Sequence, residues 1–139
     1  MLLSILLGAI LYGLIQFLWY SPWGFGGVWL AAKQQSSAEA IEEAKQPGWI
    51  RKGLQGIVIP ALLMSMAMHA LYMVLGRLGV GVFFGATLGL FVLTTVKKYS
   101  QWKAADQATR VLWRLQDGVL FVSLLTLALF VTWSLHTLY

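Results

Sequence analysis

The amino-acid sequence predicts an all-α integral membrane protein in which four transmembrane helices form a single domain over residues 1–139. Of the 139 residues, 59% are hydrophobic and only 11% are charged, and the mean hydropathy of +0.74 lies far above that of soluble domains. The apolar residues are gathered in four segments, each close to the roughly 20 residues that a helix needs to cross a bilayer. A soluble domain of this size could not hide four such helices from water.

The four apolar segments define the expected spans. The first covers residues 1–20 and has no charged side chain. It lacks the basic start and small-residue cleavage site of a removable signal peptide, so we expect a retained helix. The second covers residues 53–75 and the third residues 80–96, with so short a connection that the two should form an antiparallel hairpin. The fourth covers residues 115–138.

The positive charges predict how the helices cross the membrane. Four crossings place the loops of residues 21–52 and 97–114 on one side, where they hold nine of the ten Lys and Arg residues. Only Arg77 lies on the other side. The positive-inside rule then makes both loops cytoplasmic and both termini outward. Because these charges flank apolar runs and form no soluble basic face, we expect contact with anionic lipid and not with nucleic acid.

Both cytoplasmic loops are expected to contain short interfacial helices. In the first loop, Ser36 with Glu39 fits a capping box and Pro47-Gly48 supplies a stop, which predicts a short solvated helix. Its run of glutamates is expected to be a solvated face and not a metal or acid–base cluster. The second loop mixes tryptophans with charges, as in a helix lying among the headgroups or, equally, in an extension of the fourth helix.

Two motifs in the middle helices concern packing. Gly81, Gly85 and Gly89 form a GxxxGxxxG series, which lets another backbone approach closely. This stripe would serve packing inside the bundle, which we favour, or a homo-oligomer interface. In the second helix, Pro60 leaves the carbonyl of Gly56 without its helical donor, which predicts a kink.

Few side chains in the spans could contact a ligand. A proton-driven antiporter needs a carboxylate inside a span, whereas the first helix offers only Gln16. Met66, His69 and Met73 share a helical face and combine thioether and imidazole groups, which Cu(I) accepts. Methionine more often fills apolar gaps, and His136 is poorly matched in depth to serve as a second haem ligand. We therefore expect no metal and no cofactor.

The groups that are absent argue against an enzyme. The chain has no Cys, which removes thiolate nucleophiles and disulfides. No Asp or Glu lies deep in an expected span, since Asp117 stands at the cytoplasmic end of the fourth helix, where it should pair with Arg114 at i, i+3 spacing. No Ser/His/Asp set, HExxH motif or phosphate-binding glycine loop is present.

The stretch WYSPWGFGGVW, residues 19–29, follows the first span at the cytoplasmic interface. We interpret it as an anchored elbow in which aromatic rings sit at headgroup level and glycines allow a sharp turn. Ser21 and Pro22 fit the N-cap and first position of a new short helix. The residues expected to build this elbow are Trp19, Tyr20, Ser21, Pro22, Phe25, Gly26 and Trp29.

The elbow resembles the signature of the bacterial membrane family called domain of unknown function 1761. The signature is a W-Y-S-P run followed by F-G and W, here at residues 19–22, 25–26 and 29. The resemblance covers the order of helices and loops over most of the chain and is strongest at residues 19–29. It implies a small four-helix, multi-pass protein of a bacterial inner membrane, and it implies no particular activity.

Three functions from different classes follow. The leading one is an accessory or scaffolding subunit of a membrane complex, or a homo-oligomer, because polar groups in the spans are few and no catalytic set exists. The second is a small transporter or channel for an apolar or weakly polar solute, based on the kink at Pro60 and on the polar residues Gln16, Ser65, His69 and Thr87. The third is a metal-binding or cofactor-binding protein using Met66, His69 and Met73. Expected partners are the lipid bilayer and other membrane proteins or copies of the chain itself.

Overall fold

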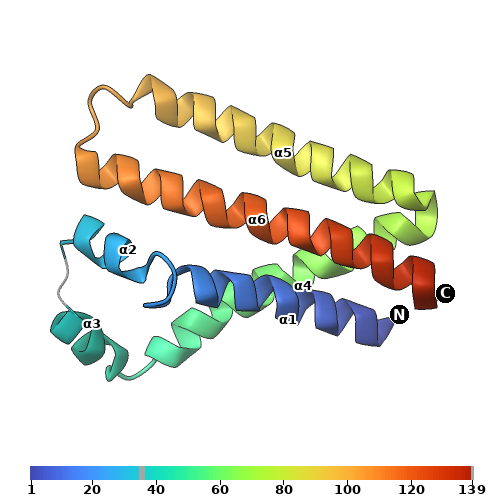
Figure 1. The fold of residues 1–139 in the computed structure, drawn as a ribbon, viewed down its shortest axis with the longest axis horizontal. Helices are drawn as coiled ribbons and strands as arrows, with labels where there is room; N and C mark the ends of the chain where they lie inside the picture. The colour runs from blue at the N-terminus through green and yellow to red at the C-terminus, as the bar shows by residue number, and fades with distance from the viewer. Residues whose placement is uncertain (35–36, 139) are drawn as a thin grey trace.

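The chain is helical throughout the part that the structure describes. The computed structural model describes residues 1–34 and 37–138, and these residues contain no strand. The helices are α1 (Leu2–Trp19), α2 (Gly26–Ala32), α3 (Ser37–Ala44), α4 (Trp49–Leu75), α5 (Arg77–Ser100) and α6 (Gln107–Leu138) (Figure 1). Four of them, α1, α4, α5 and α6, are long and apolar enough to cross a membrane. The predicted all-α architecture with four such helices is therefore confirmed.

Two of the long helices start earlier than their apolar runs. α4 begins at Trp49 and α6 begins at Gln107, well before the expected spans at residues 53–75 and 115–138. Lys, Arg, Gln and Leu are all good helix formers, so a helix need not end where its hydrophobicity ends. Most of the second loop, residues 97–114, consequently belongs to α5 and α6, and no separate interfacial helix forms there.

The first loop contains two short helices, α2 and α3. α3 occupies the region predicted to form a solvated helix, and its Glu42 carboxylate pairs with the Lys45 ammonium group at 2.6 Å, both side chains being exposed. Ser36, the proposed start of the capping box, lies outside the described residues. The carboxylates of α3 thus occupy a solvated surface, where an ion pair contributes little to stability.

The predicted hairpin between α4 and α5 is also confirmed. Gly76 ends α4 with φ +60° and ψ −145°, a backbone conformation that side chains disfavour. Gly79 then lies so close to the carbonyl of Leu71 that no side chain would fit. α4 itself continues across Pro60 as one helix of 27 residues.

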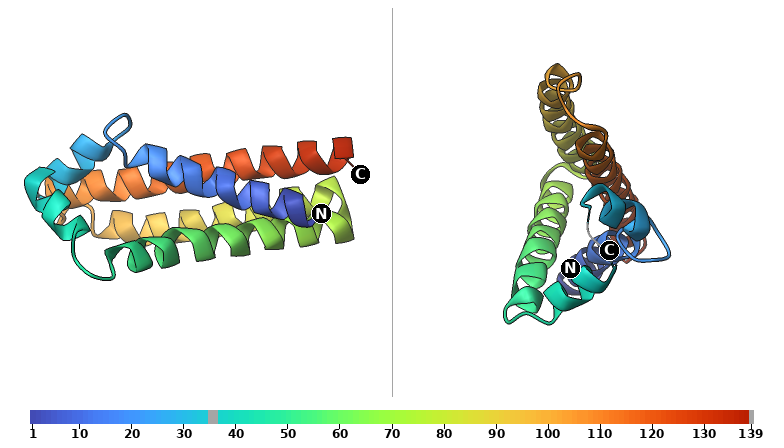
Figure 2. Two further views of the ribbon diagram at one scale, coloured as in Figure 1. Left: turned by 90° about the horizontal axis from the view of Figure 1, so that it is seen from below. Right: turned by 90° about the vertical axis from the view of Figure 1, so that its left-hand side faces the viewer.

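The four long helices form a layered bundle in which α6 is central. α1 packs against α4 and α6, and α5 packs against the same two helices on another side. Both termini and the α4–α5 turn lie at one end, here called the terminal end. α2, α3 and the α5–α6 connection lie at the other, the loop end (Figure 2). The core centres on Met68, Leu127 and Val131, all 0% exposed, whereas α5 is the least buried of the four long helices.

α1 approaches α4 and α6 closely at Gly8. A Cβ atom on Gly8 would lie 2.7 Å from the Ser65 hydroxyl oxygen of α4 and 3.1 Å from Leu127 Cδ1 of α6. The Ser65 hydroxyl also donates to the backbone carbonyl of Ile5 at 2.8 Å. Because Gly8 has no side chain, α1 and α4 come close enough for the Ser65 hydroxyl of α4 to hydrogen-bond to the backbone of α1.

Candidate functional site

The elbow after α1 is held by hydrogen bonds that point back toward the helix it follows. The Ser21 hydroxyl donates to the carbonyl of Leu18 at 2.7 Å, and the Phe25 amide donates to the carbonyl of Trp19 at 2.7 Å. α2 begins only at Gly26, with Phe25 as its N-cap residue. The prediction that Ser21 and Pro22 begin a new helix is therefore wrong, because the Ser21 hydroxyl is used to end α1.

Glycine and aromatic contacts fix the shape of this elbow. A Cβ on Gly26 would lie 2.6 Å from the Ser21 carbonyl oxygen, so only glycine fits there. The rings of Trp19 and Phe25 lie 4.6 Å apart, centre to centre. Those of Tyr20 and Trp29 lie 5.5 Å apart. These contacts join residues of the elbow to one another, as an anchoring element requires. They do not enclose a ligand site.

The elbow is also seated on α6. The Trp19 indole packs so closely on Gly118 that a Cβ there would lie 2.8 Å from Trp19 Cζ2. On the outside, the Lys33 ammonium group lies 4.3 Å from the centre of the Trp29 ring, a cation–π contact. Pro22 is exposed, so it contributes less to this seat than Trp19 does.

A cavity of about 280 Å³ lies between α1, α4 and α6, and we call it the central cavity. Its lining combines tyrosine and glutamine side chains with Gly56 and Pro60, the residues expected to kink α4. The Gln16 amide donates to the Ser123 hydroxyl at 3.1 Å. The lining residues are Tyr12, Gln16, Tyr20, Gly56, Ile57, Pro60, Gln116, Val119 and Leu120.

The sequence identified only some of the residues that line the central cavity. Gln16, Gly56, Pro60 and Tyr20 were singled out separately, and the fold brings them together. Tyr12 was missed, although its i, i+4 spacing from Gln16 in an otherwise apolar helix is a signal that could have found it.

The expected Met66, His69 and Met73 face does not converge on one point. His69 is 1% exposed, whereas Met66 and Met73 are 53% and 61% exposed. The His69 Nδ1–H donates to the carbonyl of Ser65 at 2.8 Å. Within the described part of the chain, its Nε2 has no hydrogen-bond partner, and no group of three potential His, Cys, Asp or Glu ligands exists. His69 turns into the bundle because a helix advances about 100° per residue, which sets it off from the line of the two methionines.

The glycine series of α5 is uncovered. Among the described residues, no atom lies within 4 Å of a Cβ built on Gly81, Gly85 or Gly89, and all three are exposed. The favoured prediction that these glycines pack inside the bundle is wrong. α5 meets α4 and α6 through other faces, so the series points away from both. We call this surface the α5 glycine face.

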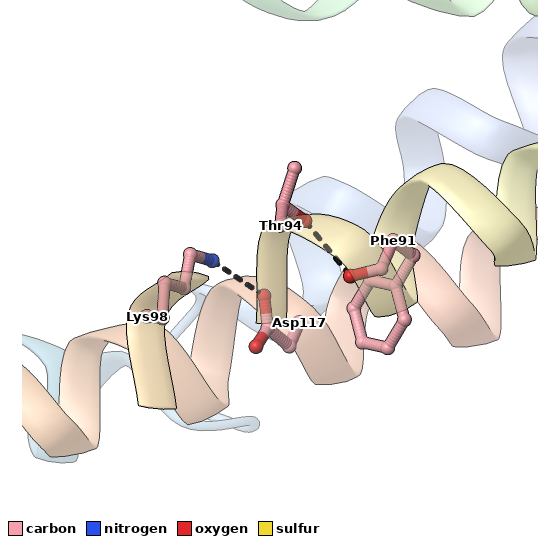
Figure 3. A network of polar contacts seen from close by, with 4 residues as sticks. All are labelled: Phe91, Thr94, Lys98 and Asp117. Carbon is pink, nitrogen blue, oxygen red and sulfur yellow. Dashed lines mark hydrogen bonds and ion pairs between the residues drawn. The ribbon is translucent and has the colours of Figure 1, made fainter. Parts of the chain in front are cut away.

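A second set of polar residues gathers between α5 and α6 at the loop end. Lys98 of α5 and Asp117 of α6 form an ion pair at 2.8 Å, with side chains 28% and 23% exposed (Figure 3). The expected pairing of Asp117 with Arg114 is therefore wrong. The guanidinium of Arg114 instead lies over the Trp102 ring, 5.1 Å from its centre.

This ion pair borders a cavity of about 180 Å³, which we call the interfacial crevice. Its lining residues are Thr95, Lys98, Trp102, Trp113, Arg114 and Asp117. The rings of Trp102 and Trp113 lie 6.2 Å apart. A second guanidinium, that of Arg110, lies 5.4 Å from the Trp102 ring centre. The sequence showed tryptophans and cations in this loop but could not show that they share one crevice.

An apolar groove of about 660 Å³ lies between α1 and α4. Apart from the Trp49 indole, hydrocarbon side chains such as Leu14, Phe17 and Leu54 line it. It offers no charged group, so it suits acyl chains and not a polar substrate.

Compared with known proteins, the chain matches no family model, no curated protein and no solved structure. The resemblance at residues 19–29 stays a prediction, and function has to be argued from the chain's own residues.

Proposed function

We propose that this chain is a multi-pass protein of a bacterial inner membrane that acts as an accessory or scaffolding subunit through helix–helix contacts. The observation that carries the proposal is the uncovered α5 glycine face. The bundle places Gly8 and Gly118 where helices and rings approach closely, but leaves Gly81, Gly85 and Gly89 without a neighbour among the described residues. A face so suited to close helix contact is the surface by which the subunit would assemble.

The orientation belongs to the same proposal. The loop end contains residues 21–34, 37–52 and 97–114, and hence nine of the ten Lys and Arg residues. The positive-inside rule supports a cytoplasmic loop end and an outward terminal end. In this orientation the elbow, with Trp19, Tyr20 and Trp29, lies at the cytoplasmic headgroups. The resemblance to the family called domain of unknown function 1761 supports a bacterial membrane protein with four helices.

We assign the α5 glycine face to a second copy of this chain. Lipid tails give helices no hydrophobic reason to associate, so contact area between small-residue faces is what holds membrane helices together. A two-fold axis presents the same face on both partners, and a smooth glycine stripe is complementary to itself. Exposed Leu78, Val82 and Leu93 flank the stripe and supply the side chains that would pack across the axis.

Cysteine cross-linking tests this assignment cleanly, because the chain has no Cys of its own. An Ala86→Cys variant places one thiol beside Gly85, on an exposed position of α5. In liposomes at a low protein-to-lipid ratio, oxidation should yield a disulfide-linked dimer, since such a bond requires Cα atoms within about 7 Å. Adding Gly85→Ile should abolish the dimer and leave the fold intact, because that position has open space in the described structure.

A matched control uses Leu129→Cys on α6, whose side chain is 64% exposed. It should give little dimer under the same conditions. Equal cross-linking at positions 86 and 129 would mean random collision and would overturn the assignment. A stoichiometric cross-link from position 86 to a different protein in native membranes would replace the second copy by that partner.

A second function is favoured by a separate observation, the central cavity. Its amide and hydroxyl groups, on Gln16, Tyr12 and Tyr20, stand beside Pro60, where α4 lacks one backbone hydrogen bond. This arrangement suits a weakly polar solute that enters from the loop end. Liposomes containing only this protein should then take up such a solute, and Gln16→Leu should slow the uptake. An absence of flux for neutral amides and alcohols would count against transport.

A further inference from the structure

We propose that the interfacial crevice between α5 and α6 binds the phosphate of an anionic phospholipid, with one acyl chain of that lipid lying along the α5–α6 seam. The proposal concerns a different face of α5 from the glycine face. It rests on the charge of the crevice, on the aromatic rings beside that charge and on the apolar surface that continues from it.

The crevice carries unbalanced positive charge. Lys98 is paired with Asp117 at 2.8 Å, so the Asp117 carboxylate of the crevice is already neutralised. The guanidinium groups of Arg110 and Arg114 stand one helical turn apart over the same Trp102 ring, at 5.4 and 5.1 Å from its centre. Like charges at this spacing repel, so a ligand of opposite charge is favoured between them.

Both arginines contact the Trp102 ring, but Arg110 has further partners. The Arg110 Nε–H donates to the backbone carbonyl of Trp102 at 2.9 Å. The pKa of the Asp106 carboxyl group is lowered chiefly by hydrogen bonds from Thr109, and the positive charge of Arg110 lowers it further by a smaller amount. In the part of the chain that the structure describes, no ion pair joins Arg114 to a carboxylate. Stacking on an indole occupies the face of a guanidinium and leaves its in-plane N–H donors free. Arg114 is therefore the group that would bind the anion.

Two tryptophan rings make the crevice suitable for binding a lipid headgroup. Trp102 and Trp113, 6.2 Å apart, have rings that suit the boundary between hydrocarbon and water. The cavity of about 180 Å³ far exceeds the roughly 10–15 Å³ that a single water requires. Basic pockets between transmembrane helices on the cytoplasmic side are suited to lipid headgroups.

An apolar seam leads away from the crevice toward the middle of the bundle. The α5 positions on it follow the spacing of one helical stripe, from Lys98 and Thr95 of the crevice to Phe91, Leu88 and Phe84. On α6 the seam passes from Asp117 to apolar side chains. Those lining residues are Leu120, Phe121 and Leu124. A charged pocket that continues into a hydrocarbon seam matches an amphipathic lipid better than a free anion.

Native mass spectrometry with matched lipids tests the proposal. The full chain in detergent is titrated with phosphatidylglycerol, with phosphatidylcholine of the same acyl chains, and with inorganic phosphate. We expect one phosphatidylglycerol bound in preference to phosphatidylcholine. We also expect Arg114→Gln to weaken phosphatidylglycerol binding about tenfold, as the loss of a charge-assisted hydrogen bond would.

The matched control is Arg51→Gln, which removes the same charge from an exposed position at the loop end of α4. It should leave the single tight site unchanged. Arg114→Lys, which keeps the charge without the planar donor fork, should bind with intermediate affinity and serves if Arg114→Gln does not fold. Equal losses for Arg51→Gln and Arg114→Gln would show a diffuse charge effect and overturn the proposal. Displacement of the lipid by millimolar inorganic phosphate would also overturn it, since the seam would then contribute nothing.

Discussion

The contact between α1 and α4 at Gly8 allows a prediction whose size follows from the structure. In Gly8→Ala, the new Cβ would lie 2.7 Å from the Ser65 hydroxyl oxygen, about 0.7 Å inside ordinary contact distance. Overpacking of this kind costs about 1–3 kcal/mol. Rotating the hydroxyl away would lose its bond to the carbonyl of Ile5, which is worth about 0.6 kcal/mol between membrane helices. The better helix propensity of Ala offsets about 0.5–1 kcal/mol, so the free energy of unfolding should fall by about 1–3 kcal/mol.

This change in the free energy of unfolding can be measured on the purified protein in bicelles, where steric trapping reports reversible unfolding. The matched control is Gly53→Ala in α4, the same substitution at a helical glycine with open space around it. It should be neutral or slightly stabilising. Because Ser65 is the nearest obstacle, Gly8→Ala should cost clearly less in a Ser65→Ala background, with a coupling energy of about 0.5–3 kcal/mol. If Gly8→Ala costs the same with and without that hydroxyl, the packing argument is wrong.

Three further predictions concern other parts of the chain. Gly26→Ala should lower the yield of folded protein well below that of Gly27→Ala, because a Cβ clashes at position 26 and meets nothing within 4 Å at position 27; equal yields, measured by fluorescence-detected size exclusion, would contradict the described elbow. Hydrogen bonds at the start of α6 hold the pKa of Asp106 below its ordinary value of 3.8, so its carboxylate stabilises the fold at neutral pH and that contribution is lost as the pH falls below about 4. Asp106→Asn should flatten this acid limb of the thermal stability profile, and an unchanged limb would refute it. Gln16→Leu should lower the free energy of unfolding by about 1 kcal/mol, because the Ser123 hydroxyl loses its donor. Steric trapping measures this change, with Leu14→Ile on the exposed side of α1 as the control, and equal stabilities of the two variants would contradict the prediction.

The fold was largely predictable because it depends on properties that are local in the sequence. The lengths of the apolar runs give the four long helices, and the short connection around Gly76 gives the hairpin, whatever the rest of the chain does. The starts of α4 and α6 were less accessible, since helix-forming polar residues carry each helix beyond its apolar run.

The candidate sites were less predictable because they depend on the rotation of each helix about its axis. A glycine series looks the same whether it faces a neighbour or the outside, and only the assembled bundle shows that Gly8 is enclosed and Gly85 is not. In the same way, the nearest cation in sequence was a reasonable partner for Asp117, but α5 brings Lys98 to it from another part of the chain. The position of His69 inside the bundle, away from Met66, follows from rotation as well.

The pairing of α1 with α6 has a consequence for how the protein is made. In the proposed membrane topology, α1 is synthesised before α6, yet part of the inward surface of α1 is completed only by α6, which follows after α2 to α5. Until then the Gln16 amide has no Ser123 hydroxyl to bond. Folding therefore includes a step in which α6 packs against the already synthesised α1. A nascent chain that stalls before this step would present an unsealed polar flank to the insertase and to membrane proteases.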